Sequence, residues 1–299
     1  MSRYLLYAVL LWSIGSSADP ITVLDDVGRE VSLAKPAVRV VSLAPHLTEI
    51  LFELGVGHRV VGTVQYSDYP EAAKSIPRLG DAFSINVEAV LAMAPDIIFA
   101  WRTGGSNRAL TKLESLGIPV YYNEAPRLED IGPGIVKIAK LLGQGEVGRQ
   151  LAAGFDEAFS RLALLHGNHE DRVDPRVFFQ ISDENLYTVN GEHLIGQAIS
   201  LCGGSNLFAE LKTPVPLVSK EAVVMGRPDL IIITRVPGAP PSSWVEKWQT
   251  FEILEGRIAS IDPNLISRPG PRMRDGIARV CQLIEEARRS VTGAPGVSR

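Results

Sequence analysis

The sequence predicts an α/β protein made of two similar lobes that one long helix joins. Apolar residues recur at three- and four-residue intervals through residues 146–165, as on one face of an amphipathic helix, and Gly145 and Gly167 bracket this segment. At 1.5 Å per residue the helix is a rod of roughly 30 Å, about the width of a small domain. Because it lies in the middle of the chain between two stretches of similar sequence, we expect one lobe on each side.

Two eleven-residue stretches carry this similarity. Residues 88–98 read EAVLAMAPDII and residues 221–231 read EAVVMGRPDLI, and six of the eleven positions coincide without a gap. In both, a short helical pattern runs into Pro-Asp, which ends a helix, and then into the apolar run of a parallel strand buried on both faces. We interpret the similarity as a duplication or a shared lobe plan. Chance recurrence of such units is the alternative.

The first lobe is expected over residues 19–145. It begins with a hairpin over residues 21–33, and Pro45 opens its first helix. The remaining elements are strands at 39–43, 59–63, 97–100 and 120–122, and helices at 46–54, after a cap at Asn86, at 108–116, and at 128–142 with an interruption at 132–134. The alternation of strand and helix predicts a parallel, right-handed βαβ layout.

The joining helix is assigned to residues 146–167 and the second lobe to residues 168–291. Ser219 is placed to cap a helix in this lobe. The other elements are strands at 176–182, 230–234 and 258–261, helices at 192–201, 244–254 and 272–290, and a proline-rich loop at 262–271. Residues 292–299 are expected to form a disordered tail.

Composition and the first residues indicate an exported globular protein. The 299 residues are 45% hydrophobic and 21% charged, enough for two domains of average size. A net charge of −4 does not suggest a nucleic-acid partner, which favours a basic face. Arg3, an apolar stretch at residues 4–14 and the small residues before Asp19 are typical of a signal peptide over residues 1–18, cleaved near Ala18.

Export changes the interpretation of the two cysteines. Cys202 and Cys281 are the only cysteines in the chain, and an oxidising compartment favours a bond between them. Such a bond ties the last helix to the early part of the second lobe. Two buried free thiols are the alternative.

Catalytic signatures are mostly absent from the sequence. It contains no G-x-S-x-G, H-E-x-x-H, Walker A or G-x-G-x-x-G motif. His166 and His169 are expected in a solvated polar loop, His193 has no evident partner, and no zinc constellation is found. His46 stands at a helix start, where it either faces a cleft or, as is favoured, has a capping or surface role. An enzyme such as a metal-inserting chelatase needs a His–Glu pair in the cleft, and His46 near Glu49 is its one candidate.

The remaining candidate site is a cleft between the lobes. Open α/β sheets bind ligands at the carboxyl ends of their strands. The residues expected there are Tyr66, Phe83, Trp101, Arg102, Ile181, Val215, Asn264 and Arg268. Aromatic faces in this position suit a large, flat, partly apolar ligand. For Trp101, ordinary packing within the lobe is the alternative.

Several motifs carry a resemblance to a known family. The hairpin sequence DDVGREV at residues 25–31 of an exported two-lobed chain resembles the helical-backbone substrate-binding proteins of ABC importers for corrinoids, siderophores and haem. Further stretches are similar to the cobalamin-binding branch of that family over nearly the whole mature chain. They are SLAPHLTEILFELG from residue 42, YSDYP from 66, NVEAVLAMAPDIIFAW from 86, CGGSNLF from 202, VSKEAV from 218 and SRPGPR from 267.

The resemblance implies a fold and a function. The fold is the class III periplasmic binding protein, in which two Rossmann-like lobes are joined by a backbone helix. The function is non-enzymatic capture of a corrinoid, either cobalamin or a related cobamide or cobinamide, for an ABC importer. A ferric siderophore or haem is the alternative ligand. With the signal peptide, this function places the protein in the periplasm, and we expect no metal site or cofactor of its own. The oligomeric state stays open, with a monomer as the best fit.

The resemblance also implies roles for individual residues. Tyr66 and Trp101 flank the corrin from the first lobe, and Arg268 contacts it from the second. Glu88 and Glu221 match two exposed carboxylates, one per lobe, that meet arginines of the transporter permease. The family's disulfide pair is matched by Cys202 and Cys281.

This chain departs from the cobalamin-binding pattern at several cleft positions. Ala82 and Val215 stand where that branch has tryptophan, and Phe83 replaces the first of them one position along. Asn264 stands at an acidic position and Ile181 at a phenylalanine. The cleft is therefore expected to be less aromatic and wider than its counterpart. A basic cleft would favour a siderophore, but the sequence offers only Arg102 and Arg268 for it.

Overall fold

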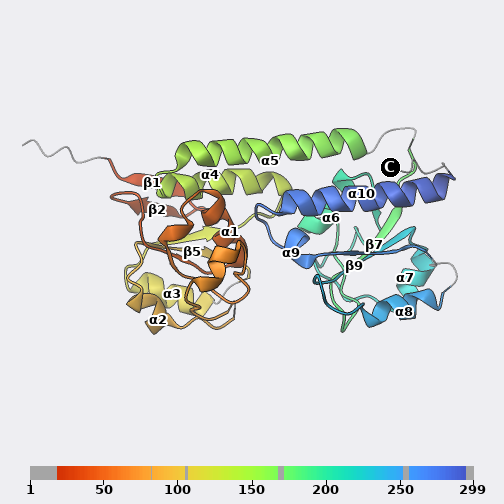
Figure 1. The fold of residues 1–299 in the computed structure, drawn as a ribbon, viewed down its shortest axis with the longest axis horizontal. Helices are drawn as coiled ribbons and strands as arrows, with labels where there is room; N and C mark the ends of the chain where they lie inside the picture. Colours follow the sequence, from red (N-terminus) through yellow and green to blue (C-terminus); the bar gives the residue numbers. More distant parts are fainter. Residues whose placement is uncertain (1–18, 82, 105–106, 168–171, 252–255, 294–299) are drawn as a thin grey trace, which may run out of the picture.

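The computed structural model describes residues 19–81, 83–104, 107–167, 172–251 and 256–293. The predicted signal peptide, Ala82, His169 and most of the predicted tail lie outside the described residues. The described chain forms a two-stranded hairpin and two four-stranded sheets, one sheet in each lobe (Figure 1).

The first lobe is built on a parallel sheet with strand order β4-β3-β5-β6. An antiparallel hairpin of β1 and β2 precedes it, as predicted. The strands are β1 (Ile21–Leu24), β2 (Glu30–Leu33), β3 (Val40–Ser42), β4 (Val60–Gly62), β5 (Ile97–Trp101) and β6 (Val120–Asn123). The helices are α1 (Pro45–Glu53), α2 (Val87–Ala92), α3 (Asn107–Ser115) and α4 (Ile131–Leu141).

The second lobe repeats this plan with strand order β10-β9-β7-β8, again all parallel. Its strands are β7 (Arg176–Gln180), β8 (Ser205–Asn206), β9 (Leu230–Thr234) and β10 (Ile258–Ile261). Its helices are α6 (Leu194–Leu201), α7 (Lys220–Gly226), α8 (Ser243–Gln249), α9 (Pro263–Ile266) and α10 (Met273–Thr292).

The predicted joining helix is α5 (Gly145–His166), which runs above both lobes (Figure 1). It lies beside α4 over the first lobe and beside α10 over the second. Phe155 and Phe159 are buried on its inner face, and the guanidinium of Arg274 from α10 lies 5.1 Å from the centre of the Phe155 ring. One continuous cluster of buried apolar side chains extends from the first sheet through this helical layer to the second.

The sequence repeat has the same hydrogen bonds in both lobes. Asp96 accepts the backbone N–H of Arg39 at 2.8 Å, and Asp229 accepts that of Arg176 at 2.9 Å. The two arginine side chains then donate to carbonyls at the ends of α2 and α7. A non-glycine residue in left-handed conformation follows each helix, with φ of 45° and 48°, at Ala94 and Arg227. These matched details support the shared lobe plan over chance recurrence.

The structure corrects the predicted helices at two places. The sequence Gly132-Pro133-Gly134 does not interrupt a helix, because it lies in the first turn of α4, where backbone N–H groups have no partner within the helix for a proline to remove. The proline-rich loop contains the short helix α9, since Asp262 caps it and Pro263 occupies its first position.

Three boundaries also differ from the prediction. Strand β7 ends at Gln180 and helix α8 at Gln249, earlier than expected, while α10 continues to Thr292, where the tail was expected to begin. His166 is the last residue of α5 rather than part of a polar loop. Such shifts are the usual uncertainty of helix and strand ends read from sequence patterns.

Candidate functional site

A cavity of about 920 Å³ lies between the two lobes. The first lobe contributes the end of β5 and the segment that follows β6, and the second contributes the start of α6 and the loop after α9. The lining residues are Trp101, Thr103, Glu124, Ala125, Pro126, Arg127, Glu192, His193, Leu194, Gln197, Pro214, Val215, Ile266, Ser267 and Pro269. The volume is near the upper end of the usual range for small-molecule sites, about 300–1,000 Å³.

A smaller hollow of about 320 Å³ adjoins this cavity. The two share Trp101 from the first lobe and Ser267 and Pro269 from the second. The start of α1 and Tyr66 form the rest of the first-lobe wall, and Asn264 and Arg268 face them from the second lobe. The cleft is therefore continuous, with Trp101 between its two parts.

The structure brings five of the predicted ligand-contacting residues into this cleft. They are Tyr66, Trp101, Val215, Asn264 and Arg268. Tyr66 has a φ of 64°, in the left-handed region that non-glycine residues seldom adopt, and 73% of the residue is exposed. A sparsely populated backbone conformation of this kind is characteristic of functional sites.

The other three predicted residues do not line either part of the cleft. Phe83 is 90% exposed, Arg102 lies over the ring of Tyr122 at 5.1 Å, and Ile181 packs against the apolar core. Residues next to each other in an extended chain point to opposite faces, so Arg102 turns away where Trp101 turns in. The strand-end rule locates the rim of a cleft but not the direction of each side chain.

Most of the polar lining of the larger cavity was not predicted from the sequence. Glu124 and Arg127 follow strand β6, where the same strand-end rule could have found them. Gln197 could not have been found in this way, because it lies inside a helix. Its side chain accepts a hydrogen bond from the backbone of Leu128 at 3.1 Å and donates one to Pro126 at 2.8 Å, so it joins the second lobe to the first.

His193 also has a structural role that the sequence did not show. Its Nδ1 accepts the backbone N–H of Ile195 at 3.1 Å and so caps α6. This bond leaves the proton of the neutral ring on Nε2, and burial lowers the pKa of the ring. His193 therefore lines the cavity as a neutral hydrogen-bond donor.

The proposed chelatase pair does not form. His46 bonds through Nε2 to Oδ1 of Asn123 at 3.1 Å, while the carboxylate of Glu49 is held by Arg268 and Arg272. His46 is not on the surface, since only 1% of it is exposed, but it lines the smaller hollow, as the cleft-facing alternative expected, and its ring meets Trp101 edge-on at 5.5 Å. The pair is therefore not arranged for proton transfer between its members.

The class of this protein follows from its similarity to a known family. A model of the family described as periplasmic binding protein matches residues 40–255. The chain belongs to this family. It is a periplasmic solute-binding protein, and the expectations of a class III fold, a non-enzymatic role and a periplasmic location are confirmed.

Individual relatives agree with this assignment. A vitamin B12-binding protein of Vibrio campbellii is 33% identical over 254 residues, which cover 85% of this chain and 91% of the relative. The crystal structure of the periplasmic vitamin B12-binding protein BtuF of Vibrio cholerae is 31% identical, with a TM-score of 0.75, and the match covers 84% of this chain and 98% of that one. The periplasmic heme-binding protein RhuT of Roseiflexus sp. RS-1 shares the fold at 23% identity, with a TM-score of 0.72 and coverage of 83% and 98%.

The environment of His46 in this periplasmic binding protein makes stability depend on pH. Burial lowers the pKa of His46 to about 4; the hydrogen bond to Asn123 acts against this shift, and the positive charge of Arg268 adds to it. Asn123 in turn donates to Asp26 at 2.7 Å, which fixes its orientation. In the unfolded chain a histidine has a pKa of about 6.5. Below that pH the unfolded state binds the proton first, so the free energy of unfolding falls as pH falls toward 4.

We therefore expect the free energy of unfolding to decrease by about 2 kcal/mol between pH 7.5 and pH 5 through His46 alone. Urea unfolding at the two pH values measures the decrease. Other groups titrate in this range, so the same measurement is made on His46→Gln, which keeps a donor for Asn123 but no titrating ring. The variant should lose less stability on acidification, and an equal loss in both proteins would contradict the assignment.

The two predicted docking glutamates lie on different lobes. Glu88 is in the first turn of α2 and Glu221 in the first turn of α7, and both are exposed. Figure 1 places both helices away from α5. A backbone hydrogen bond at the helix start and the neighbouring Lys112, 3.5 Å away, lower the pKa of Glu88. Each lobe of the periplasmic binding protein thus presents one of these two glutamates to solvent.

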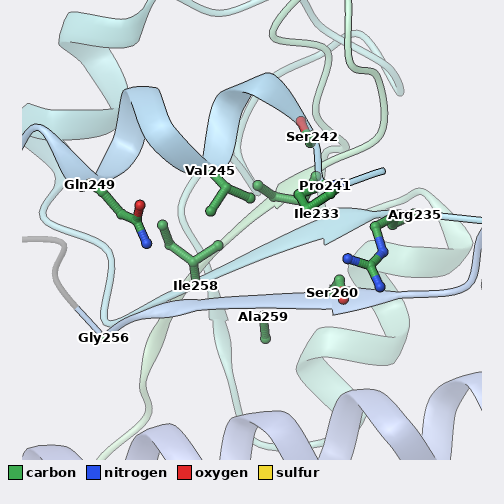
Figure 2. A pocket seen from close by; sticks show the side chains of 10 residues that line it. All are labelled: Ile233, Arg235, Pro241, Ser242, Val245, Gln249, Gly256, Ile258, Ala259 and Ser260. Carbon is green, nitrogen blue, oxygen red and sulfur yellow. The ribbon is translucent and has the colours of Figure 1, made fainter. Parts of the chain in front are cut away.

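A further hollow of about 300 Å³ lies within the second lobe, between α8 and the strands β9 and β10 (Figure 2). Val245 of α8 and Ile258 of β10 point toward each other across it, with Arg235 and Ser260 at one end and Gln249 at the other. It shares no lining residue with the cleft.

In the described residues no helix is long and apolar enough to cross a membrane. No group of three histidine, cysteine or acidic side chains among these residues is placed to hold a metal ion.

Proposed function

We propose that this protein captures a corrinoid, either cobalamin or a related cobamide or cobinamide, in the cleft and delivers it to an ABC importer. The observation that carries the proposal is the placement of Tyr66 and Trp101 on one wall and Arg268 on the other. These are the residues for which the resemblance to cobalamin binders implies contact with the corrin. The vitamin B12-binding proteins similar to this chain support the same ligand class.

The chemistry of the cleft suits such a ligand. A corrin is a large, flat ring with an apolar body and a rim of amide side chains. Trp101 and Tyr66 offer aromatic faces, and polar groups such as Gln197 and Thr103 line the larger cavity. Val215 occupies little space where a tryptophan is found in the related branch, so the cleft has room for corrinoids that differ in their lower base.

The charge of the lining argues against a ferric siderophore. The larger cavity and the adjoining hollow are lined by two arginines, Arg127 and Arg268, and by two acids, Glu124 and Glu192. The lining is therefore balanced in charge, whereas an anionic iron complex favours a basic cleft. Arg102, which the sequence offered as a second cation for the cleft, lies instead over Tyr122.

Calorimetric titration of the mature protein with cyanocobalamin and with cobinamide tests the proposal. Submicromolar one-to-one binding of at least one is expected. Trp101→Ala should weaken that binding about 10- to 100-fold, because truncating a buried aromatic contact costs roughly 1.5–3 kcal/mol. Leu164→Ala, which changes an exposed residue of α5, is the control and should leave the affinity unchanged. Absence of heat with both corrinoids, together with binding of haem or a ferric siderophore, would overturn the ligand assignment.

We also propose that Glu88 and Glu221 are the groups that dock on the transporter. The support is their matched place in the two copies of the repeat, each at an exposed helix start. A protein with two similar lobes that docks on a two-fold symmetric permease presents the same charge on each lobe.

A further inference from the structure

A buried ion network crosses from one lobe to the other beside the ligand cleft. Glu49 lies on α1 of the first lobe and is 2% exposed. Its carboxylate accepts hydrogen bonds from Arg272 at 2.6 and 3.0 Å and from Arg268 at 3.2 Å. Both arginines belong to the segment of the second lobe that joins α9 to α10. All three bonds of the carboxylate therefore come from the opposite lobe.

The side chains of the network are shielded from solvent and make further contacts between the lobes. The side chains of Arg268 and Arg272 are only 17% and 15% exposed. Asp68 of the first lobe lies 3.8 Å from Arg268, and Tyr69 of the same loop lies under the guanidinium of Arg272 at 4.3 Å. Each arginine thus has two first-lobe partners.

The backbone confirms how closely the lobes approach at this point. A Cβ added at Gly270, between the two arginines, would lie only 3.1 Å from the Cβ of His46 on α1. His46 is neutral at physiological pH and adds no charge. Among the described acidic groups near the two arginines, Glu49 is buried, whereas Asp68 is 51% exposed and Asp262 is partly exposed.

The network lies at one end of the cleft, and the bonds of Gln197 lie at the other. Arg268 lines the smaller hollow, whereas Gln197 lines the larger cavity and joins Pro126 and Leu128 of the first lobe. The two sets of polar contacts therefore bracket the space that the ligand would occupy.

We propose that Glu49 is a positioning residue that holds the two lobes together at the cleft and fixes Arg268 in its wall. Without the carboxylate, two guanidiniums would face each other with no buried counter-charge, and the second-lobe segment would move away from α1. Release of a ligand between the lobes then requires this network to break. The ligand part of the inference rests on the proposed function, whereas the effect on the lobes does not.

The first test measures the lobes without any ligand. Nitroxide labels at Lys74→Cys and Glu210→Cys, exposed positions on different lobes, report the distance between the lobes by pulsed electron paramagnetic resonance. Glu49→Gln should shift the distribution to longer or broader distances. Glu49→Asp, which keeps the charge, should restore part of the original distribution, and the exchange Glu49→Arg with Arg272→Glu should restore more than either single change.

The second test measures retention of the ligand. Dissociation of cyanocobalamin should be at least about tenfold faster from Glu49→Gln than from the unchanged protein, because loss of one partner of a buried charge pair acts mainly on the dissociation rate. Near-ultraviolet circular dichroism identifies any variant that fails to fold, and Arg272→Lys, which keeps the charge but not the paired hydrogen bonds, is the milder replacement for such a variant.

The outcomes separate the two proposals. An unchanged inter-lobe distribution in folded Glu49→Gln would overturn the role of Glu49, whatever the ligand proves to be. A shifted distribution in a protein that binds no corrinoid would leave the role of Glu49 standing and remove the ligand assignment. A shifted distribution with an unchanged dissociation rate would show that the network joins the lobes without retaining the ligand.

Discussion

Replacing Glu88 and Glu221 together by arginine is expected to abolish association with the transporter while ligand affinity stays the same. Each change puts a positive charge where the permease is expected to present arginine, and like charges brought together at an interface cost several kcal/mol. The combined loss in affinity should exceed about a thousandfold. Neither residue lines the cleft, so calorimetric titration with the ligand should give an unchanged affinity.

Surface plasmon resonance on the transporter in lipid nanodiscs measures the association. The matched control is Asp156→Arg with Glu157→Arg, which changes the net charge equally at exposed positions of α5, away from α2 and α7 (Figure 1). If docking depends on the two glutamates, only the first pair of substitutions removes binding. Equal behaviour of the two double variants would show that the glutamates only complement the helix dipole, a contribution of roughly 0.5 kcal/mol.

The fold was predictable because its signals are local and repeated. The helical period of residues 146–165 and the two Pro-Asp boundaries each report on a few neighbouring residues. The structure shows why the boundaries recur, since Asp96 and Asp229 accept a backbone N–H at the start of the neighbouring strands β3 and β7 in the same way. Because the same hydrogen bonds form in both lobes, the Pro-Asp pattern occurs twice in the chain and can be recognised in a single sequence.

The cleft was predictable only in part, because its position depends on topology and its chemistry on side-chain direction. Trp101 was found since it ends a buried strand that faces the other lobe. Arg102 was placed in the cleft with it, although the alternating geometry of an extended chain turns it toward Tyr122. The sequence shows the two-residue period of a strand. It does not show which of the two faces of that strand meets the second lobe.

Contacts between the two lobes could not be predicted from the sequence. Glu49 and Arg272 are 223 positions apart, and no periodic pattern links residues at such a distance. The sequence instead suggested His46 as the partner of Glu49, because the two are close along the chain. The structure separates them, since His46 bonds to Asn123 and the carboxylate of Glu49 faces the other lobe.

Loss of the disulfide is expected to lower the free energy of unfolding by about 4 kcal/mol. The structure has the predicted bond between Cys202 and Cys281, which are 79 positions apart and fully buried. A crosslink that closes a loop of this length acts mainly by restricting the unfolded chain. Urea unfolding of Cys202→Ala with Cys281→Ala, compared with the oxidised protein, measures the change. An equal free energy of unfolding in the two would contradict the expectation.

The same variant separates the stability of a lobe from the junction between lobes. Cys202 follows α6 and Cys281 lies within α10, so the bond is internal to the second lobe. Its removal should leave the inter-lobe distance and the affinity for the ligand unchanged in the folded protein. Glu49→Gln should do the reverse, because its partners Arg268 and Arg272 lie across the cleft. A change of inter-lobe distance in the cysteine variant would mean that the second lobe deforms without its crosslink, and the two effects would then have a common cause.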